Sequence, residues 1–148
     1  MLMPQMKFYK RLLLFLLLWF PAYLLFAQQG IKFNRLTVED GLSQNNINQI
    51  IQDQNGFVWF ATNGGLNRFD GIEFKTFIHD RNSDNSISNN IINHLYEDDH
   101  GNIWVSTQNG LNVYNSKNET FSHFKNIIND PHSISHNQVT CVTQDQKG

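Results

Sequence analysis

The sequence predicts an all-β fold built from repeated four-stranded units, and three observations support this prediction. A phrase of about twenty residues occurs twice, with Gly56 of the first copy and Gly101 of the second 45 positions apart. Within each copy, short runs of Ile, Val, Phe, Trp and Thr alternate with Asn, Asp and Gly, as in strands joined by tight turns. One run, "FVWFAT" at 57–62, is apolar without alternation, which indicates a strand covered on both faces.

The first 27 residues differ from the rest of the chain. Lys7, Lys10 and Arg11 precede an uncharged run at 12–27. This pattern predicts an export signal, and the run is shorter than the roughly 20 residues of a spanning helix. Residues 1–27 are therefore expected to form a hydrophobic helix that is either a cleaved signal peptide or an uncleaved N-terminal anchor, and 28–148 are expected to be exported.

The exported part is acidic. It carries eight Lys or Arg residues and thirteen Asp or Glu residues, which argues against a nucleic-acid partner. Cys141 is the single cysteine of the chain, so no internal disulfide can form. Stability must then come from packing.

The first unit divides into four expected strands at 47–53, 57–62, 66–69 and 72–77, separated by the turns "QNG", "NGG" and "DG". The second unit repeats the same order. The positions that recur in both are Asp53, Gly56, Trp59, Thr62, Gly65 and Leu66 in the first unit and Asp98, Gly101, Trp104, Thr107, Gly110 and Leu111 in the second. The short sequence segment that precedes the first strand of each unit recurs a third time, starting at residue 134.

A period near 45 residues suits a four-stranded blade, and blades packed face to face explain strands that are apolar on both sides. The expected architecture is a partial β-propeller in an incomplete domain, 28–148, with antiparallel blades at 42–77 and 87–124 and the start of a third at 134–148. The phrase "FNRL" at 33–36 is similar to the fourth-strand phrases "FKTF" and "FSHF". Residues 31–37 are therefore predicted to close the last blade of the ring.

The motifs "GLSQNNINQIIQDQNGFVWFATNGGLNRFDG" and "SISNNIINHLYEDDHGNIWVSTQNGLNVYN" resemble the two-component regulator propeller repeat of Bacteroidetes hybrid histidine kinases. The resemblance implies the N-terminal fragment of a periplasmic sensor whose parent is a histidine kinase anchored in the inner membrane. It further implies an oligosaccharide ligand, more blades in the same parent chain and a homodimer of the full-length sensor.

The recurring residues have structural interpretations beside chemical ones. Asp53 and Asp98 precede turn glycines, where a carboxylate caps backbone amides, and they make a poor acid/base pair. Trp59 and Trp104 are expected in packing between blades, with stacking on a sugar ring as the alternative. Thr62 and Thr107 are expected to satisfy backbone groups at the blade edge.

The connections between blades, 79–90 and 126–137, are the longest polar segments. Loops on a rigid scaffold commonly carry recognition, so the candidate ligand-binding residues are His79, Arg81, Asn82, Asp84 and Asn85. The alternative is a solvated connector that binds nothing.

No metal, cofactor or catalytic residue is predicted. The loop 80–86 has alternating oxygen ligands, but Asn85 and Ile91 replace the Gly and Glu of a calcium loop. The six histidines lack the spacing and cysteine partners of a zinc site.

Three classes of function stay open: a ligand-sensing module, an exported propeller enzyme acting on carbohydrate, and a protein-binding scaffold. A glycosidase needs two carboxylates about 5 to 10 Å apart across a cleft, and no such pair stands out. Because two blades leave two apolar faces uncovered, 28–148 alone is expected to be poorly soluble or only partly ordered.

Overall fold

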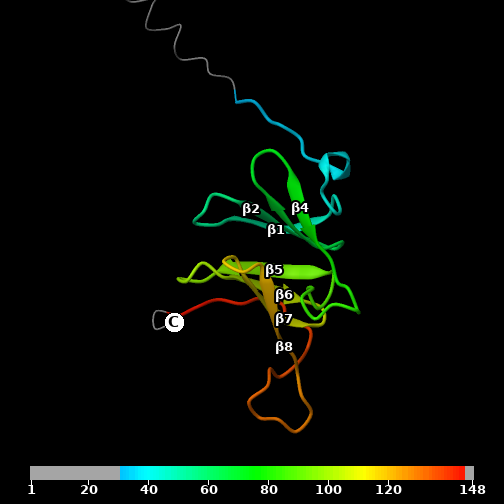
Figure 1. Cartoon of the computed structure of the whole chain (residues 1–148), viewed down its shortest axis with the longest axis vertical. Coiled ribbons are helices and arrows are strands. Elements are labelled where there is room, and N and C mark those ends of the chain that lie inside the picture. The colour runs from blue at the N-terminus through cyan, green and yellow to red at the C-terminus, as the bar shows by residue number, and fades with distance from the viewer. Residues whose placement is uncertain (1–30, 146–148) are drawn as a thin grey trace, which may run out of the picture. The chain divides into compact units, whose positions relative to one another are not determined.

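In a computed structural model, the described residues are 31–145, and they form two four-stranded antiparallel sheets (Figure 1). The expected segment 1–27 lies outside this range. A short 3-10 helix, η1, precedes the first sheet. The elements are η1 (Val38–Asp40), β1 (Ile47–Gln52), β2 (Val58–Thr62), β3 (Leu66–Phe69), β4 (Phe74–Phe77), β5 (Ile92–Glu97), β6 (Ile103–Thr107), β7 (Gly110–Asn115) and β8 (Thr120–Phe124). Within 31–145 there is no helix with the length and apolar character needed to cross a bilayer.

Each sheet is a meander in which neighbours in sequence are neighbours in space, β1-β2-β3-β4 and β5-β6-β7-β8. The two sheets share even their irregularities, since the ladder of the first strand shifts between Ile47 and Gln49 and again between Ile92 and His94. The predicted all-β class and the four-stranded antiparallel units are confirmed.

The core lies between the sheets, where the first contributes Trp59 and Leu66 and the second contributes Leu95 and Tyr114. The rings of Trp59 and Tyr114 meet edge to face with centroids 5.2 Å apart. Such aromatic contacts add to the hydrophobic stabilisation of buried area. One sheet therefore buries its apolar face only because the other covers it.

Strand β2 is buried on both faces, as its unbroken apolar sequence predicts. Trp59 points to the second sheet, whereas Phe60, which is 8% exposed, lies on the opposite face and packs against Phe74 with centroids 5.5 Å apart. Contacts within the sheet therefore cover that second face, since no other sheet lies on it among the described residues.

The innermost strands of the two sheets are joined by side chains. Asn48 Nδ2 donates to the carbonyl of Ile92 at 2.7 Å, and Gln49 Oε1 accepts the amide of Leu95 at 2.5 Å. The Glu97 carboxylate accepts the Gln54 amide at 3.1 Å. Asn48 and Gln49 thus satisfy backbone groups on the edge of β5 that has no strand beside it, which is how an exposed strand edge is kept from pairing elsewhere, and Glu97 satisfies an amide of the β1–β2 turn.

Residues 134–145 form no strand, yet they contact the second sheet in the same manner. Asn93 Nδ2 donates to the carbonyl of Val139 at 2.7 Å, and the Val139 amide donates to the carbonyl of Thr107 at 3.0 Å. Val139 thus bonds to the second sheet as Ile92 bonds to the first, and the start of a third blade at 134–148 stays a prediction. Residues 31–37 also form no strand, and their role in closing a last blade stays a prediction.

Candidate functional site

One buried carboxylate, that of Asp53, stabilises the turn between β1 and β2. Asp53 Oδ1 accepts the amides of Asn55 and Phe57 at 2.9 and 3.0 Å. Its Oδ2 accepts the indole N–H of Trp59 at 2.7 Å. All of these acceptor positions are occupied by the turn and by the strand that follows it, so Asp53 has a structural role here.

The second sheet repeats this arrangement. Asp98 accepts the amides of His100 and Asn102 at 2.9 Å each, and the indole N–H of Trp104 at 2.9 Å. Burial raises the pKa of Asp98, but hydrogen bonds from the Asn102 and Trp104 side chains and from the backbone outweigh it, so the pKa is lowered. A carboxylate stabilised in its ionised form is a poor general acid.

A second network links the start of each unit to its central turn. Ser43 donates its amide to Asn67 Oδ1 at 2.9 Å, and Asn67 Nδ2 donates to Ser43 Oγ at 2.8 Å. Thr62 Oγ1 lies 2.9 Å from Ser43 Oγ and donates to the carbonyl of Gly65 at 2.8 Å. Thr62 therefore serves the β2–β3 turn rather than an outer edge of the sheet.

The same network recurs as Ser88, Thr107, Gly110 and Asn112, with matching partners. Asn67 and Asn112 were not among the residues expected to matter from the sequence. The sequence nevertheless indicates them, because an Asn directly follows the aligned residues Leu66 and Leu111 and so recurs in both units.

The two tryptophans differ in their surroundings. Trp59 is fully buried between the sheets and stacks on Phe77 with centroids 5.9 Å apart. Trp104 is half-buried and stacks on Phe124 at 5.8 Å, on the face of the second sheet that points away from the first. No described sheet covers Trp104.

The five loop residues proposed for ligand binding divide into two groups. The His79 ring contacts the carbonyl of Ile87 at 2.8 Å, and the Asn85 amide group bonds to the backbone of Glu119 and Phe121. His79 therefore bonds within the connection, and Asn85 holds the connection against the second sheet at the start of β8. The other three side chains are exposed: Arg81, Asn82 and Asp84.

A charged cluster lies where the third and fourth strands meet the second sheet. Lys75 Nζ is 2.7 Å from Glu119, and Arg68 is 3.5 Å from Glu119 and 3.4 Å from the Tyr114 hydroxyl. A hydrogen bond from Lys75 lowers the pKa of Glu119, and burial raises the pKa of Tyr114 to about 12. The Glu119 carboxylate is paired with Lys75 and Arg68, so the cluster joins the two sheets and its charges largely neutralise one another.

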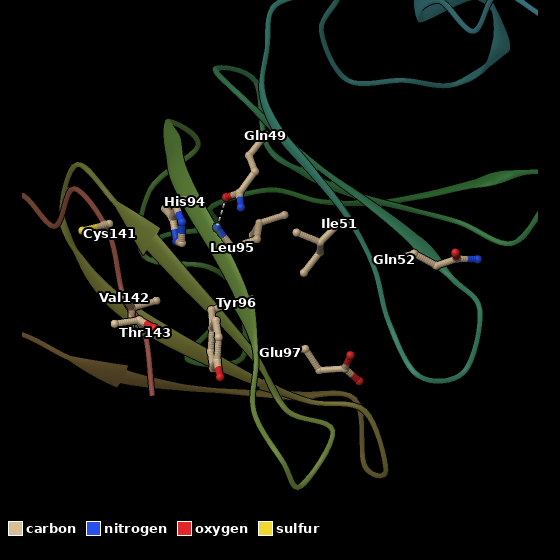
Figure 2. Close-up of a pocket in the computed structure, with 10 residues that line it drawn as sticks. All are labelled: Gln49, Ile51, Gln52, His94, Leu95, Tyr96, Glu97, Cys141, Val142 and Thr143. Atoms are coloured by element: carbon tan, nitrogen blue, oxygen red, sulfur yellow. Dashed lines mark hydrogen bonds between the residues drawn. The ribbon is translucent and has the colours of Figure 1, made fainter. Parts of the chain in front are cut away.

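An open pocket of about 520 Å³ lies along the inner strands (Figure 2). It is lined by β1, by β5 and by residues 141–143, and Figure 2 shows Gln49 reaching across it to Leu95. The polar lining includes Tyr96 and Thr143, with Glu97 as the only carboxylate and no Lys or Arg. His94 is therefore the one lining side chain that could carry a positive charge toward an anionic ligand.

Within residues 31–145, no three His, Cys, Asp or Glu side chains gather as metal ligands. The exposed thiol of Cys141 stands at the pocket rim without a second cysteine.

The model of the two-component regulator propeller family matches residues 41–64 and 86–109. These spans hold the Asp–Trp turns and the Ser–Thr pairs described above. The chain carries two two-component regulator propeller repeats.

A solved structure extends the likeness beyond the repeats. The extracellular domain of the hybrid two component system BT3049 from B. thetaiotaomicron is 41% identical, with a TM-score of 0.72, over 77% of this chain. The match covers 16% of that domain. The extracellular domain of BT4673 from the same organism is 20% identical with a TM-score of 0.40.

Among curated proteins, Histidine kinase P4 of Formosa agariphila is 47% identical over 45 residues. The matched segment is 30% of this chain and 3% of that kinase. The chain thus spans a small part of each of these larger proteins, and its two propeller repeats are part of a larger propeller.

Proposed function

We propose that the chain is part of the extracellular propeller of a two-component sensor, located in the periplasm. The observation that carries this proposal is the 41% identity to the BT3049 extracellular domain over 77% of the chain. The two propeller repeats and the likeness to a histidine kinase support the same conclusion. In this proposal the kinase lies elsewhere in an inner-membrane parent protein, and the segment 1–27 exports the propeller.

The sensor detects an oligosaccharide and regulates polysaccharide utilisation. Arg81, Asn82 and Asp84 support a binding role for the loop 79–90, since their exposed side chains are free to contact a ligand. His79 and Asn85 then shape the loop from below. Ligand binding would shift the relative positions of the propellers and of two partners in a homodimer, because a ligand favours the arrangement that it binds best.

An exported glycosidase receives less support. Asp53 and Asp98 are the recurring carboxylates, and their oxygens are occupied by turn amides and indole N–H groups. A catalytic pair needs carboxyl groups that face a substrate across a cleft.

The test is a transcriptional reporter driven by the full-length sensor in cells supplied with a panel of oligosaccharides. We expect one glycan class to induce the reporter, and deletion of 28–148 to abolish induction while the kinase is still produced. Arg81→Ala and Asp84→Ala should raise the glycan concentration for half-maximal response, whereas Lys117→Ala, on an exposed turn, should not. A response that persists without 28–148 contradicts the proposal.

A further inference from the structure

The open pocket between β1, β5 and residues 141–143, the channel pocket, lies along the inner edge of β5, on the side where a propeller has its central channel. Figure 2 shows the side chains of β5 between those of β1 and those of 141–143. The innermost strand of every blade borders that channel. Further sheets therefore add to the wall of the channel and leave its interior open.

A bond that crosses between the two sheets has no counterpart at His94. Gln49 Oε1 accepts the amide of Leu95 at 2.5 Å. His94 is the aligned residue of the second unit, and its buried Nδ1 has no hydrogen-bond partner among the described residues. This nitrogen stands one bond nearer to its main chain than the Oε1 of a glutamine, so it cannot span the gap that Gln49 spans. The space beside His94 therefore stays open as part of the channel pocket.

A second polar atom without a partner lies next to His94. Ser106 on β6 is fully buried, and within residues 31–145 its Oγ makes no hydrogen bond. Ser106 pairs with His94 in the antiparallel ladder, so the two side chains lie on the same face of the sheet. The first sheet has Ala61 at the aligned position, which needs no partner. Since buried polar atoms normally bond to protein, water or ligand, these two atoms indicate a polar occupant on this side of β5.

The lining of the channel pocket favours an uncharged occupant with hydroxyl groups. It contains no Lys or Arg, and both oxygens of Glu97 already accept the Gln54 amide at 3.1 Å. A hydroxyl group both donates and accepts, so it can bond to His94 Nδ1 in either tautomer. Tyr96 adds an aromatic ring to the lining and Thr143 adds a hydroxyl. A sugar ring matches this combination, because it is apolar on its faces and polar at its edge.

We propose that the channel pocket binds a neutral sugar of one or two rings, with a hydroxyl group of the sugar bonded to His94 Nδ1. The volume of the pocket, about 520 Å³, lies in the range of roughly 300 to 1,000 Å³ that is common for small-molecule sites. The inference deepens the proposed sensor function, on which it rests, because it adds a binding place in the channel to the one at the connection 79–90.

The experiment measures sugar binding to the purified extracellular region of the full-length sensor by isothermal titration calorimetry. The probes are glucose, galactose, maltose and cellobiose, with glucuronate as the charged comparison. His94→Gln introduces a side chain that can bridge the gap as Gln49 does and so close the pocket. Thr143→Val removes a lining hydroxyl at an exposed position, and His132→Gln, on the exposed connection 126–137, is the matched control. Circular dichroism and thermal melting check that each variant folds.

We expect at least one of the neutral sugars to bind, and glucuronate to bind more weakly than that sugar. His94→Gln should abolish the binding, and Thr143→Val should weaken it roughly 5-fold, the effect of one lost hydrogen bond. His132→Gln should bind the sugar as the unaltered protein does. The inference is overturned if no neutral sugar binds, if glucuronate binds as tightly, or if folded His94→Gln binds unchanged. If His94→Gln does not fold, unchanged binding by Thr143→Val overturns it.

Calorimetry and the transcriptional reporter separate this inference from the proposed function. A reporter that responds to a glycan while no neutral sugar binds in the channel pocket overturns the inference alone. Sugar binding that His94→Gln abolishes, in a sensor that drives no reporter, supports the channel pocket and contradicts the proposed function alone.

Discussion

The indole nitrogen of Trp59 donates a hydrogen bond of 2.7 Å to Oδ2 of Asp53, six residues earlier in the chain. Trp104 and Asp98 make the same bond at 2.9 Å. The carboxylate that caps the turn between the first two strands thereby fixes the indole that faces the next sheet. Local turn geometry and packing between sheets depend on the same two residues.

This pairing predicts strong coupling between Asp53 and Trp59. Asp53→Ala should lower the free energy of unfolding by about 3 kcal/mol, since two amides and an indole N–H lose a charged acceptor. A double-mutant cycle of Asp53→Asn and Trp59→Phe, measured by urea unfolding, should give a coupling energy of about 1.5 kcal/mol. Additive effects of the two substitutions would contradict the structural role of the bond.

Substitution of two turn glycines, Gly56 and Gly65, should lower the free energy of unfolding by unequal amounts. Gly65 has φ of 138°, and an added Cβ would meet the carbonyl oxygen of Phe77 at 2.8 Å. Gly56 has φ of 89° and nothing within 4 Å of an added Cβ. Gly56→Ala should therefore cost about 1 kcal/mol of backbone strain. Gly65→Ala should cost clearly more in the same thermal or urea unfolding measurement, and equal losses would show that the close approach of β4 does not matter.

Gln49 predicts a local effect on the neighbouring sheet. Gln49→Ala removes the acceptor of the Leu95 amide, at a cost of about 1 kcal/mol, and should speed hydrogen exchange at Leu95. Gln52→Ala is the control, because Gln52 bonds only within its own turn, to the carbonyl of Gly56 at 3.2 Å. Unchanged exchange at Leu95 in Gln49→Ala would disprove the edge-capping role.

Asp98 predicts a loss of stability in acid. Its folded pKa is lowered, although burial alone would raise it, because the Asn102 and Trp104 side chains and backbone amides bond to the charged form. The contribution is present above the unfolded pKa, near 3.8, and disappears as the pH falls through the lower folded value. The free energy of unfolding should thus decline below about pH 4.

Asp98→Asn isolates that contribution, since the amide cannot titrate. Urea unfolding at pH 7 and at low pH should show a smaller pH difference in Asp98→Asn than in the unaltered chain. Identical pH dependence in both proteins would show that Asp98 adds nothing to acid sensitivity.

Much of the fold could be read from local patterns. Strands of Ile, Val, Phe and Thr and turns at Asn, Asp and Gly reflect short-range preferences, and β1 to β4 lie within a residue or two of the expected runs. The networks of Asn67 and Asn112 escaped notice because their partners, Ser43 and Ser88, lie 24 positions away in the chain. Polar residues inside strands look like surface residues until such a partner is known.

The loop 79–90 shows a similar limit. Composition alone marked His79, Arg81, Asn82, Asp84 and Asn85 as equal candidates. Hydrogen bonds separate them, because the His79 ring bonds to the Ile87 carbonyl within the loop and Asn85 bonds to the Phe121 amide of the second sheet, and folding brings both partners near.

The amino-acid sequence by itself determined the repeat, the four-stranded unit and the chemistry of its turns, since these depend on backbone preferences over a few residues. Only the tertiary structure decided that Trp59 is sealed between sheets while its counterpart Trp104 stays half-open, and that Gln49 caps the edge of β5. Aligned residues of the two repeats have different surroundings because the burial of a side chain depends on which neighbouring sheet covers its face. That neighbour is fixed only when the sheets assemble.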